Sequence, residues 1–392
     1  MKETNQVLID AIKVFLFQEQ IVLSSIQEEV VLAARENGLS AMLYHAAILS
    51  KISIPEALKR DYYHFIQRDT LQQLAIQEIK EALNKEAISH VFLKGSHLKT
   101  LYHPSYVRGM GDIDILVDPL QMKRVHQVFE TLKYRNTHNS PNHDMFEKGK
   151  DVIVEVHPKL NSEFDERFEG LFGHEWEETV LESGSTYRFS AEFECSYLIY
   201  HLAKHFSNSG IGMRSVLDIG IYYNAYLKTF DNELFFTWLE KGNLTIFASH
   251  LFALLVEVFG FSRFACQDLF PPCQRTDLDS MLEWISFSGV HGKAKEFNTS
   301  VAGMASASAK TSSTKKGKRL FILKLLFPPR KQLVSTYPFL KNWGILLPLA
   351  WGLRAFTLTF RKTKRSIHRL KSLQVNNEEV SEAANLFQRI GL

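Results

Sequence analysis

Cysteine is scarce in this chain of 392 residues, and a secretion signal is not evident. The three cysteines, Cys195, Cys266 and Cys273, form no CxxC pair, which argues against a disulfide framework and against a zinc site. The N-terminal stretch mixes acids and glutamines into its apolar residues, without the charged-then-apolar layout or the cleavage site of a signal peptide. We therefore expect a reducing, cytoplasmic setting.

Acidic residues are missing from one long stretch near the C-terminus. No Asp or Glu occurs between Phe297 and Asn377, which contains 16 Lys and Arg, so the rest of the chain sums to −13 although the total is +3. Within this stretch, the 11 residues from Trp343 to Leu353 are largely apolar but are followed by Arg354, and a membrane-spanning helix needs about 20. Two interpretations stay open: an interfacial helix near anionic lipid, and a helix packed on the acidic body with its cations outward.

The spacing of apolar residues divides the chain into five regions, and its length favours two or three subdomains. Residues 1–88 have helical spacing, and residues 89–160 contain strand-like runs around one helix. Helical spacing returns in residues 161–297. Residues 298–318 are small, polar and finally basic, which predicts a linker or mobile loop. Residues 319–392 form a basic, hydrophobic and helical C-terminal region.

Three short runs in the second region have the pattern of β-strands. Residues 89–94 are mostly apolar and end at a Gly-Ser pair, as a strand entering a tight loop does. Residues 112–117 alternate and are followed by Asp118 and Pro119, which predict a helix start. Residues 151–157 form the third run. The order strand, loop, strand, helix, strand indicates an α/β or α+β core.

Carboxylates interrupt two of these strands at positions that share a face. Asp112 and Asp114 project from the same side of their strand, and Glu155 shares a side with His157. Two carboxylates so close repel each other unless a cation lies between them, and oxygen ligands suit Mg²⁺ or Mn²⁺. If the two strands are neighbours, Glu155 completes a cluster of three carboxylates. The alternatives without a metal site are a solvated strand end for the two aspartates and a surface-facing or salt-bridged strand residue for Glu155.

The Gly-Ser pair lies directly after the first strand. Glycine lets the backbone approach a phosphate closely, and the N–H groups and the Ser96 hydroxyl can donate to it. An isolated Gly95-Ser96 pair is also typical of an ordinary turn. Lys94 is either a phosphate ligand or the polar rim of the strand end. The order of Gly-Ser, the DxD motif and a strand with Glu is more specific than any one of these motifs.

Taken together, these motifs resemble the uncharacterised nucleotidyltransferase family of the polymerase-β superfamily, whose pattern is LKG…R…DxDxLV…ExH. The matching segments are Phe92-Leu-Lys-Gly-Ser-His-Leu98, Leu101-Tyr102, Arg108-Gly-Met-Gly-Asp-Ile-Asp-Ile-Leu-Val117 and Val154-Glu-Val-His157. The resemblance covers roughly residues 75–230 with motifs. It implies an α+β fold in which a small mixed sheet that holds nucleotide and metal is embedded in a mostly helical chain.

The resemblance also implies roles for individual residues. Gly95-Ser96, together with Lys94, would face the triphosphate, and Asp112 and Asp114 would bind Mg²⁺ or Mn²⁺. Glu155 would be the third carboxylate, which binds metal and assists the attacking hydroxyl. Arg108 matches the arginine that precedes the DxD motif and would contact phosphate or serve the structure.

The activity implied is transfer of a nucleoside monophosphate from ATP or another NTP to a hydroxyl- or phosphate-bearing acceptor, a reaction of the EC 2.7.7 type. A small molecule, a glycan precursor, a peptide or a protein would be the acceptor. Nucleic acid is disfavoured because the cations are concentrated after the core and no continuous basic groove is indicated. The alternatives are a catalytically silent nucleotide-binding or scaffold module and a peripheral membrane protein that contacts lipid through residues 319–371.

A second group of polar residues lies in the later helical region. His201 and His205 are one helical turn apart, but Leu202 stands where a zinc protease needs glutamate. Family members show a similar His…Arg…Asp pattern there, so His205, Arg214 and Asp218 are candidate nucleotide or acceptor contacts, as is His157. The bland interpretations are satisfied or surface histidines and an Arg214–Asp218 ion pair at i, i+4.

Overall fold

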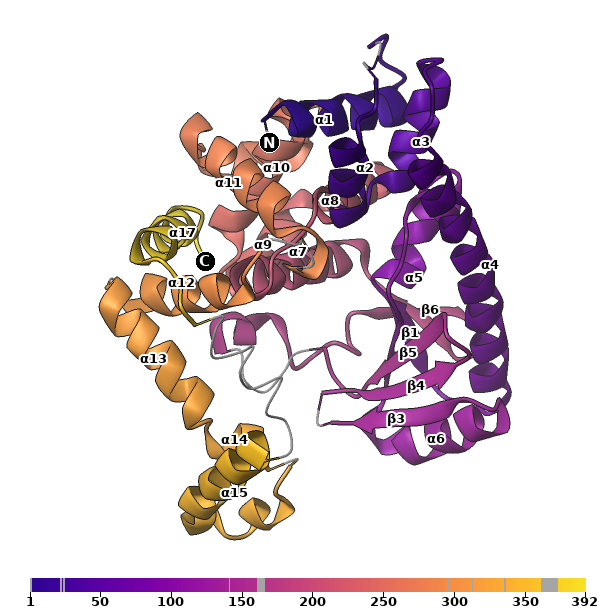
Figure 1. Cartoon of the computed structure of the whole chain (residues 1–392). Helices are drawn as coiled ribbons and strands as arrows, with labels where there is room; N and C mark the ends of the chain where they lie inside the picture. Colours follow the sequence, from indigo (N-terminus) through magenta and orange to yellow (C-terminus); the bar gives the residue numbers. More distant parts are fainter. Residues whose placement is uncertain are drawn as a thin grey trace.

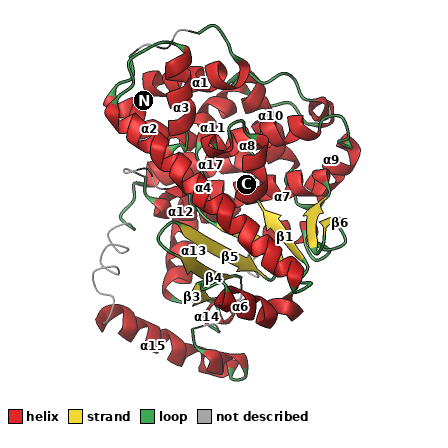
Figure 2. Ribbon diagram, turned by 90° about the vertical axis from the view of Figure 1, so that its right-hand side faces the viewer, coloured by secondary structure: helices red, strands yellow, loops and turns green. Residues whose placement is uncertain are grey.

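The computed structural model of the chain confirms an α+β fold, with a mixed sheet embedded in a mostly helical chain (Figures 1 and 2). It describes all residues except Met1, Val22, Ser24, Pro141, 161–165, Lys293, 295–296, Ser312, Ser335 and 361–372. The strands are β1 (His90–Leu93), β2 (Ile113–Val117), β3 (Arg135–Asn139), β4 (Asp144–Lys148), β5 (Val152–His157), β6 (Thr179–Ser183) and β7 (Thr186–Phe189).

Helices cover both faces of the sheet, and most of them form a helical body on one side of it (Figure 1). They are α1 (Lys2–Phe17), α2 (Glu28–Glu36), α3 (Ser40–Leu49), α4 (Glu56–Lys85), α5 (Gly95–Leu98), α6 (Met122–Thr131), α7 (Ala191–Asn208), α8 (Met213–Tyr226), α9 (Asn232–Lys241), α10 (Thr245–Glu257), α11 (Arg275–Ser288), α12 (Thr299–Thr311), α13 (Thr314–Leu326), α14 (Arg330–Leu333), α15 (Leu347–Phe360) and α17 (Asn377–Arg389).

The seven strands form one sheet in the order β3-β4-β5-β2-β1-β7-β6. The three strands predicted from the sequence, β1, β2 and β5, are neighbours near its centre, with β2 antiparallel to β1 and parallel to β5. The remaining four strands were not predicted. All residues of β3 are exposed, as are most of those of β6, so neither strand has the apolar alternation that a half-buried strand shows.

The alternation of side chains along β2 sends its apolar and acidic residues to different places. Ile113, Ile115 and Val117 pack in one core with α4 and α6, which cover that face of the sheet. Leu116, on the opposite face, belongs to the larger core that includes residues of α7 and α8. Asp114 alternates with the first group and so faces the helical body.

Residues 298–318, predicted to be a linker or mobile loop, contain α12 and the first turn of α13. Val301 and Met304 of α12 are buried, and the helix packs against α7 and α17. A Cβ on Gly317 of α13 would come within 2.3 Å of Ser308 of α12. The small residues that suggested a linker therefore allow two helix backbones to approach closely.

A small unit at the end of α13 stands apart from the body (Figure 1). It contains α14 and α15 around a core of Leu333, Leu340 and Ala350. The chain then returns to α17, which packs on α12. Residues 361–371, the last part of the predicted lipid-contact region, lie outside the described residues. Among the described residues, the structure has no helix long and apolar enough to cross a membrane.

Candidate active site

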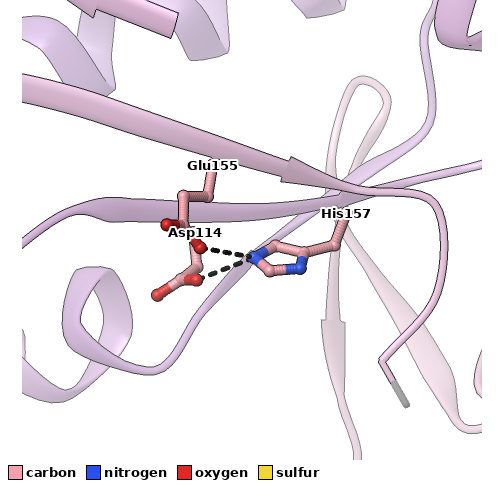
Figure 3. A group of neighbouring side chains, drawn as sticks. All are labelled: Asp114, Glu155 and His157. Carbon is pink, nitrogen blue, oxygen red and sulfur yellow. Dashed lines mark hydrogen bonds and ion pairs between the residues drawn. The ribbon is translucent and has the colours of Figure 1, made fainter. Parts of the chain in front are cut away.

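The pairing of the central strands brings the predicted carboxylates together. Asp114 of β2 lies opposite Glu155 of β5 and opposite Leu93, the last residue of β1. The expectation that the second and third predicted strands are neighbours is therefore met. His157 follows two residues later on the same face of β5 and points toward both acids (Figure 3).

His157 and Lys94 both bind the same oxygen of Asp114. The distances from Asp114 Oδ1 to His157 Nε2 and to Lys94 Nζ are both 2.8 Å. His157 Nε2 is also 3.6 Å from Glu155 Oε2. One ligand atom from each of Asp114, Glu155 and His157 lies within 4.8 Å of the other two, which is close enough to share a metal ion. Asp112 lies outside this group of three, but it lines a pocket together with Asp114 and Glu155.

The pKa values of the three carboxylates are shifted in different directions. Burial alone would raise the pKa of Asp114, but the charge of Lys94 and the hydrogen bond from His157 hold it far below its usual range. Burial raises the pKa of Glu155 to about 7, with smaller contributions from Asp112 and Asp114. Burial, and then Asp114, also raises the pKa of Asp112. Two of the three acids thus carry an unfavourable charge that a cation would relieve.

The donor set fits a divalent metal. Carboxylate oxygens are the ligands that Mg²⁺ and Mn²⁺ favour. The pKa values of Asp112 and Glu155 are raised by burial first and by neighbouring carboxylates second, and a bound cation would offset both effects. His157, predicted only as a substrate contact, belongs to the cluster as well. Its position two residues after Glu155 on an alternating strand was the sequence signal for this placement.

Lys94 has a strained backbone at the end of β1. Its φ is 46° and its ψ is −113°, a conformation that a residue with a Cβ rarely adopts. This turn places the ammonium of Lys94 against Asp114. Burial would lower the pKa of Lys94, but the charge of Asp114 outweighs that effect and raises the pKa. The structure thus places Lys94 in the carboxylate cluster.

The next two residues begin the short helix α5. Gly95 lines the pocket, and a Cβ there would approach Arg108 Nη1 and Met110 Sδ to 2.7 Å. Ser96 is buried and its hydroxyl lies 3.8 Å from the same sulfur of Met110. Ser96 is not among the residues that line the pocket, although its predicted role was to face the triphosphate.

Arg108 pairs with an acid from the helical body. Its Nε and Nη2 donate to the two oxygens of Asp218 on α8, at 3.2 and 2.8 Å, and the Tyr102 hydroxyl donates to Oδ1 at 2.7 Å. All three side chains are buried. Asp218 was expected to contact substrate or to pair with Arg214, but its hydrogen-bonded partners among the described residues are Arg108 and Tyr102. Arg108 therefore ties the loop before β2 to the helical body.

Three consecutive carbonyls of that loop accept hydrogen bonds from side chains. Arg214 Nη1 of α8 donates to the carbonyl of Gly109 at 2.6 Å, and Arg68 Nη2 of α4 donates to that of Gly111 at 2.6 Å. Gln72 Nε2, also of α4, donates to the carbonyl of Met110 at 3.1 Å. This clamp fixes the backbone that leads into Asp112. Neither Arg68 nor Gln72 was singled out in the sequence, because both occur in a long helix full of polar residues.

A pocket of about 360 Å³ lies between the central strands of the sheet and the helices α7 and α8. The polar residues that line it are Lys94, Arg108, Asp112, Asp114, Glu155, His201, His205, Arg214, Ser215 and Asp218. The structure thus places the candidates from the helical region in the wall opposite the carboxylates. His205 Nδ1 is 2.8 Å from the hydroxyl of Ser209, the residue that follows α7. Burial, and then Arg108, lowers the pKa of Arg214 to about 10.

Comparison with known proteins gives one family match. A family model described as an uncharacterised nucleotidyltransferase matches residues 25–260, which include the whole sheet and the helices that line the pocket. No curated protein matches the chain. One solved structure that it resembles is the solution structure of the antibiotic-resistance factor ANT(2'')-Ia, with 15% sequence identity and a TM-score of 0.32. The match covers 43% of this chain and 90% of that one, and it is too distant to support a conclusion about activity.

Proposed function

The chain belongs to the uncharacterised nucleotidyltransferase family, and from this premise we propose that it transfers a nucleoside monophosphate from an NTP to an acceptor in a reaction that depends on a divalent metal. The observation that carries the proposal is the register of β2 and β5, which sets Asp114 directly beside Glu155. The acceptor would bear a hydroxyl or a phosphate, as a small molecule, a glycan precursor, a peptide or a protein does.

Asp112, Asp114 and Glu155 would hold the metal, with His157 beside them. When bound, Mg²⁺ or Mn²⁺ supplies charge neutralisation at the phosphates and lowers the pKa of the attacking hydroxyl. The acidic pocket wall could not accept a triphosphate without such a counter-charge. The lysine of the loop, Lys94, would add a second positive charge on the same side of the pocket.

The reaction requires one bond to form and one to break. The acceptor oxygen bonds to the α-phosphorus of the NTP, the bond from that phosphorus to the bridging oxygen breaks, and pyrophosphate leaves. Glu155 would take the proton of the acceptor hydroxyl, because its carboxylate lines the pocket directly beside Asp114. The remainder of catalysis in this scheme is position and electrostatics.

The opposite wall would bind the rest of the nucleotide or the acceptor. His201 and His205 of α7 and Arg214 of α8 line it, together with apolar residues such as Leu198 and Ile219. An apolar wall with a few polar groups is typical of a small-molecule site and offers a surface for a base or a sugar. Arg214, which already holds the Gly109 carbonyl, would couple substrate binding to the loop before Asp112.

Binding and turnover of the four NTPs with Mg²⁺ or Mn²⁺ test this proposal. The full chain is compared with the Asp112→Asn/Asp114→Asn double variant and with Asp151→Asn, which alters an acid just before β5 and outside the pocket. We expect metal-dependent binding of at least one NTP, pyrophosphate release and self- or acceptor labelling from α-labelled NTP, all lost in the double variant and kept in Asp151→Asn.

Two other outcomes are informative. If the wild type binds an NTP in a metal-dependent way but releases no pyrophosphate with any acceptor class offered, the chain is a silent nucleotide-binding module. If neither wild type nor variant binds an NTP while both show the same cooperative unfolding, the nucleotidyltransferase proposal is wrong.

A further inference from the structure

The small unit of α14 and α15, taken here together with α13, exposes many large apolar side chains. Near α15, Trp343 is 63% exposed and Ile345 is 86% exposed. Leu349 and Leu353, on the helix itself, are 54% and 42% exposed. Leu349 and Leu353 are four residues apart on α15 and therefore lie on one face, and Ile345 lies in the 3-10 turn that leads directly into this helix. A continuous apolar stripe at such exposure is unusual on the surface of a soluble domain.

The opposite face of α15 is already used by the protein. Ala350 is buried in the small core, and Trp351 Nε1 donates to the carbonyl of Pro328 at 2.9 Å. Arg354 Nη1 donates to the carbonyl of Leu325 at 3.1 Å. These contacts hold α15 against the end of α13, so that the apolar stripe of Ile345, Leu349 and Leu353 faces outward.

The helix α13 adds exposed cations beside exposed apolar residues. Its exposed apolar residues and the phenylalanine that follows are Leu320, Leu323, Leu326 and Phe327. Its exposed cations are Lys315, Lys316, Arg319 and Lys324. The inner side of α13 packs on α12 through Gly317 and Phe321, so these outward residues do not serve that contact.

The charge of this unit is not balanced by the acidic body. No Asp or Glu occurs from Phe297 to Asn377. In the part of the chain that the structure describes, none of the nine Lys and Arg from Lys315 to Arg354 forms an ion pair with a carboxylate. Lys318, Arg330 and Arg354 instead donate to backbone carbonyls, which leaves their charges uncompensated.

We propose that this unit docks on an anionic lipid membrane. Trp343, Ile345, Leu349 and Leu353 insert at the boundary between headgroups and acyl chains, and the cations of α13 contact the headgroups. Charge complementarity favours this occupant, because every formal charge in the unit is positive. The large exposed fractions of these apolar side chains suit insertion into a fluid layer. The docking does not depend on the proposed transfer reaction.

Co-sedimentation with lipid vesicles tests the docking. The full chain is mixed with vesicles of phosphatidylcholine alone and with vesicles that contain phosphatidylglycerol, at low and high salt. We expect at least about tenfold stronger binding to the anionic vesicles, weakened by salt because exposed charges are screened. Trp343 fluorescence should shift to shorter wavelength on binding, and Trp343→Phe should lose that shift.

Matched variants separate this surface from general stickiness. Ile345→Ser/Leu349→Ser/Leu353→Ser should lower binding about tenfold or more. The control Leu74→Ser/Leu120→Ser/Leu181→Ser removes three exposed leucines, 66%, 91% and 56% exposed, from the body and should bind as the wild type does. Lys316→Gln/Arg319→Gln/Lys324→Gln should remove the preference for anionic lipid.

Several results would overturn the docking. One is wild-type protein that stays in the supernatant with anionic vesicles at low salt. Another is an Ile345→Ser/Leu349→Ser/Leu353→Ser variant that binds as the wild type does, while it and the wild type both unfold cooperatively. Light scattering without vesicles measures whether the protein associates with itself. If the wild type is an oligomer that the triple serine variant converts to monomer, without a difference in lipid binding, the stripe is an interface between copies of this chain.

Discussion

Lys94 and His157 donate to the same oxygen, Asp114 Oδ1, each at 2.8 Å. The carboxylate at the centre of the candidate active site is therefore neutralised by two groups from neighbouring strands, one from the strained turn after β1 and one from β5. The protein itself holds this acid in its charged form. The pKa values of Asp112 and Glu155 are raised by burial first, and the charge of Asp114 adds a smaller contribution.

We expect Lys94→Met to lower the free energy of unfolding by about 1–3 kcal/mol, because Asp114 then stays buried with only His157 as a partner. Mn²⁺ should raise the melting temperature of this variant more than that of the wild type, since the ion takes over neutralisation of Asp114. Thermal unfolding with and without Mn²⁺ measures the difference.

Lys99→Met is the matched control for that experiment. Lys99 is buried and pairs with Asp69 at 2.5 Å, outside the carboxylate cluster. Its loss should destabilise the protein to a similar extent, but Mn²⁺ should not restore the stability. An equal response of both variants to Mn²⁺ would show that the ion does not bind beside Asp114.

The pKa of Glu155 gives the protein a defined dependence on pH. Burial, followed by Asp112 and Asp114, raises this pKa to about 7 in the folded state, whereas it is about 4.3 in an unfolded chain. The folded state therefore binds more protons between these values, and the free energy of unfolding falls as the pH rises through this window. The fall is at most about 4 kcal/mol, since one pKa unit corresponds to about 1.4 kcal/mol, and solvent screening of this partly exposed group reduces it.

Glu155→Gln removes this titration. In EDTA, the variant should be more stable than the wild type at about pH 8 and should lose that advantage at about pH 4–5. Urea unfolding of both proteins at the two pH values measures the change. With Mn²⁺ present, the wild type should regain stability at the higher pH. A stability difference that does not depend on pH would mean that Glu155 is already ionised below this window.

The buried Arg108–Asp218 pair should be worth more to stability than a surface ion pair. Asp218→Ala leaves the Arg108 guanidinium buried without its carboxylate, and we expect a loss of about 3–5 kcal/mol. Tyr102→Phe removes one hydrogen bond to the same acid and should cost about 1 kcal/mol. Urea unfolding of each variant provides the numbers.

A double variant tests whether the cost comes from the unpaired charge. Arg108→Met/Asp218→Leu should be less destabilised than the sum of the two single changes, because it leaves neither charge buried. If Asp218→Ala costs no more than Tyr102→Phe, the pair is solvated in solution and does not tie the loop to α8.

This pair also shows where sequence reasoning stops. Arg214 and Asp218 are four residues apart on one helix, so an ion pair between them was the local interpretation. The structure instead joins Asp218 to Arg108, 110 positions earlier in the chain. Spacing along one helix predicts neighbours on that helix, but it carries no information about which distant loop packs there. Arg214 instead donates a hydrogen bond to the carbonyl of Gly109.

The fold was predictable where apolar periodicity was strong. Ile113 to Val117 and Val152 to His157 alternate clearly, so the strands and the faces of their acids followed from the sequence. The edge strand Arg135–Asn139 is polar and exposed, and it forms only by pairing with β4. The helix Thr299–Thr311 consists mainly of small residues, whose close packing on α13 and α17 depends on partners that local composition does not reveal.

Gln72 should position Asp112 through the backbone. Gln72→Leu removes the donor to the Met110 carbonyl, and we expect a fall in kcat of about tenfold with a smaller change in KM, because the backbone before Asp112 loses one of its three supports. Gln73→Leu is the control, since Gln73 bonds to Asp69 and Ser105 and not to this loop.

Kinetics with the NTP identified in the binding experiment measure the split, and equal effects of the two variants on kcat would remove the special role of Gln72. A loss confined to KM would instead place the Met110 carbonyl in substrate binding.

Gly95 at the start of α5 and Gly111 in the clamped loop should respond differently to an added methyl group. A Cβ on Gly95 would meet Arg108 Nη1 and Met110 Sδ at 2.7 Å, and the hydrogen bonds from Arg108 Nε and Nη2 to Asp218 hold that guanidinium in place. We expect Gly95→Ala to lower the free energy of unfolding by about 1–3 kcal/mol. Gly111→Ala meets nothing within 4 Å and should leave stability within about 0.5 kcal/mol of the wild type.

Thermal unfolding of the two alanine variants, side by side, tests this reasoning. Because Gly111 has open space and no left-handed φ, any large loss at that position would come from a backbone requirement that the structure does not show. If Gly95→Ala is as stable as the wild type, the Arg108 side chain has an alternative position. Its pair with Asp218 would then be mobile, and the large cost predicted for Asp218→Ala should fail in the same protein.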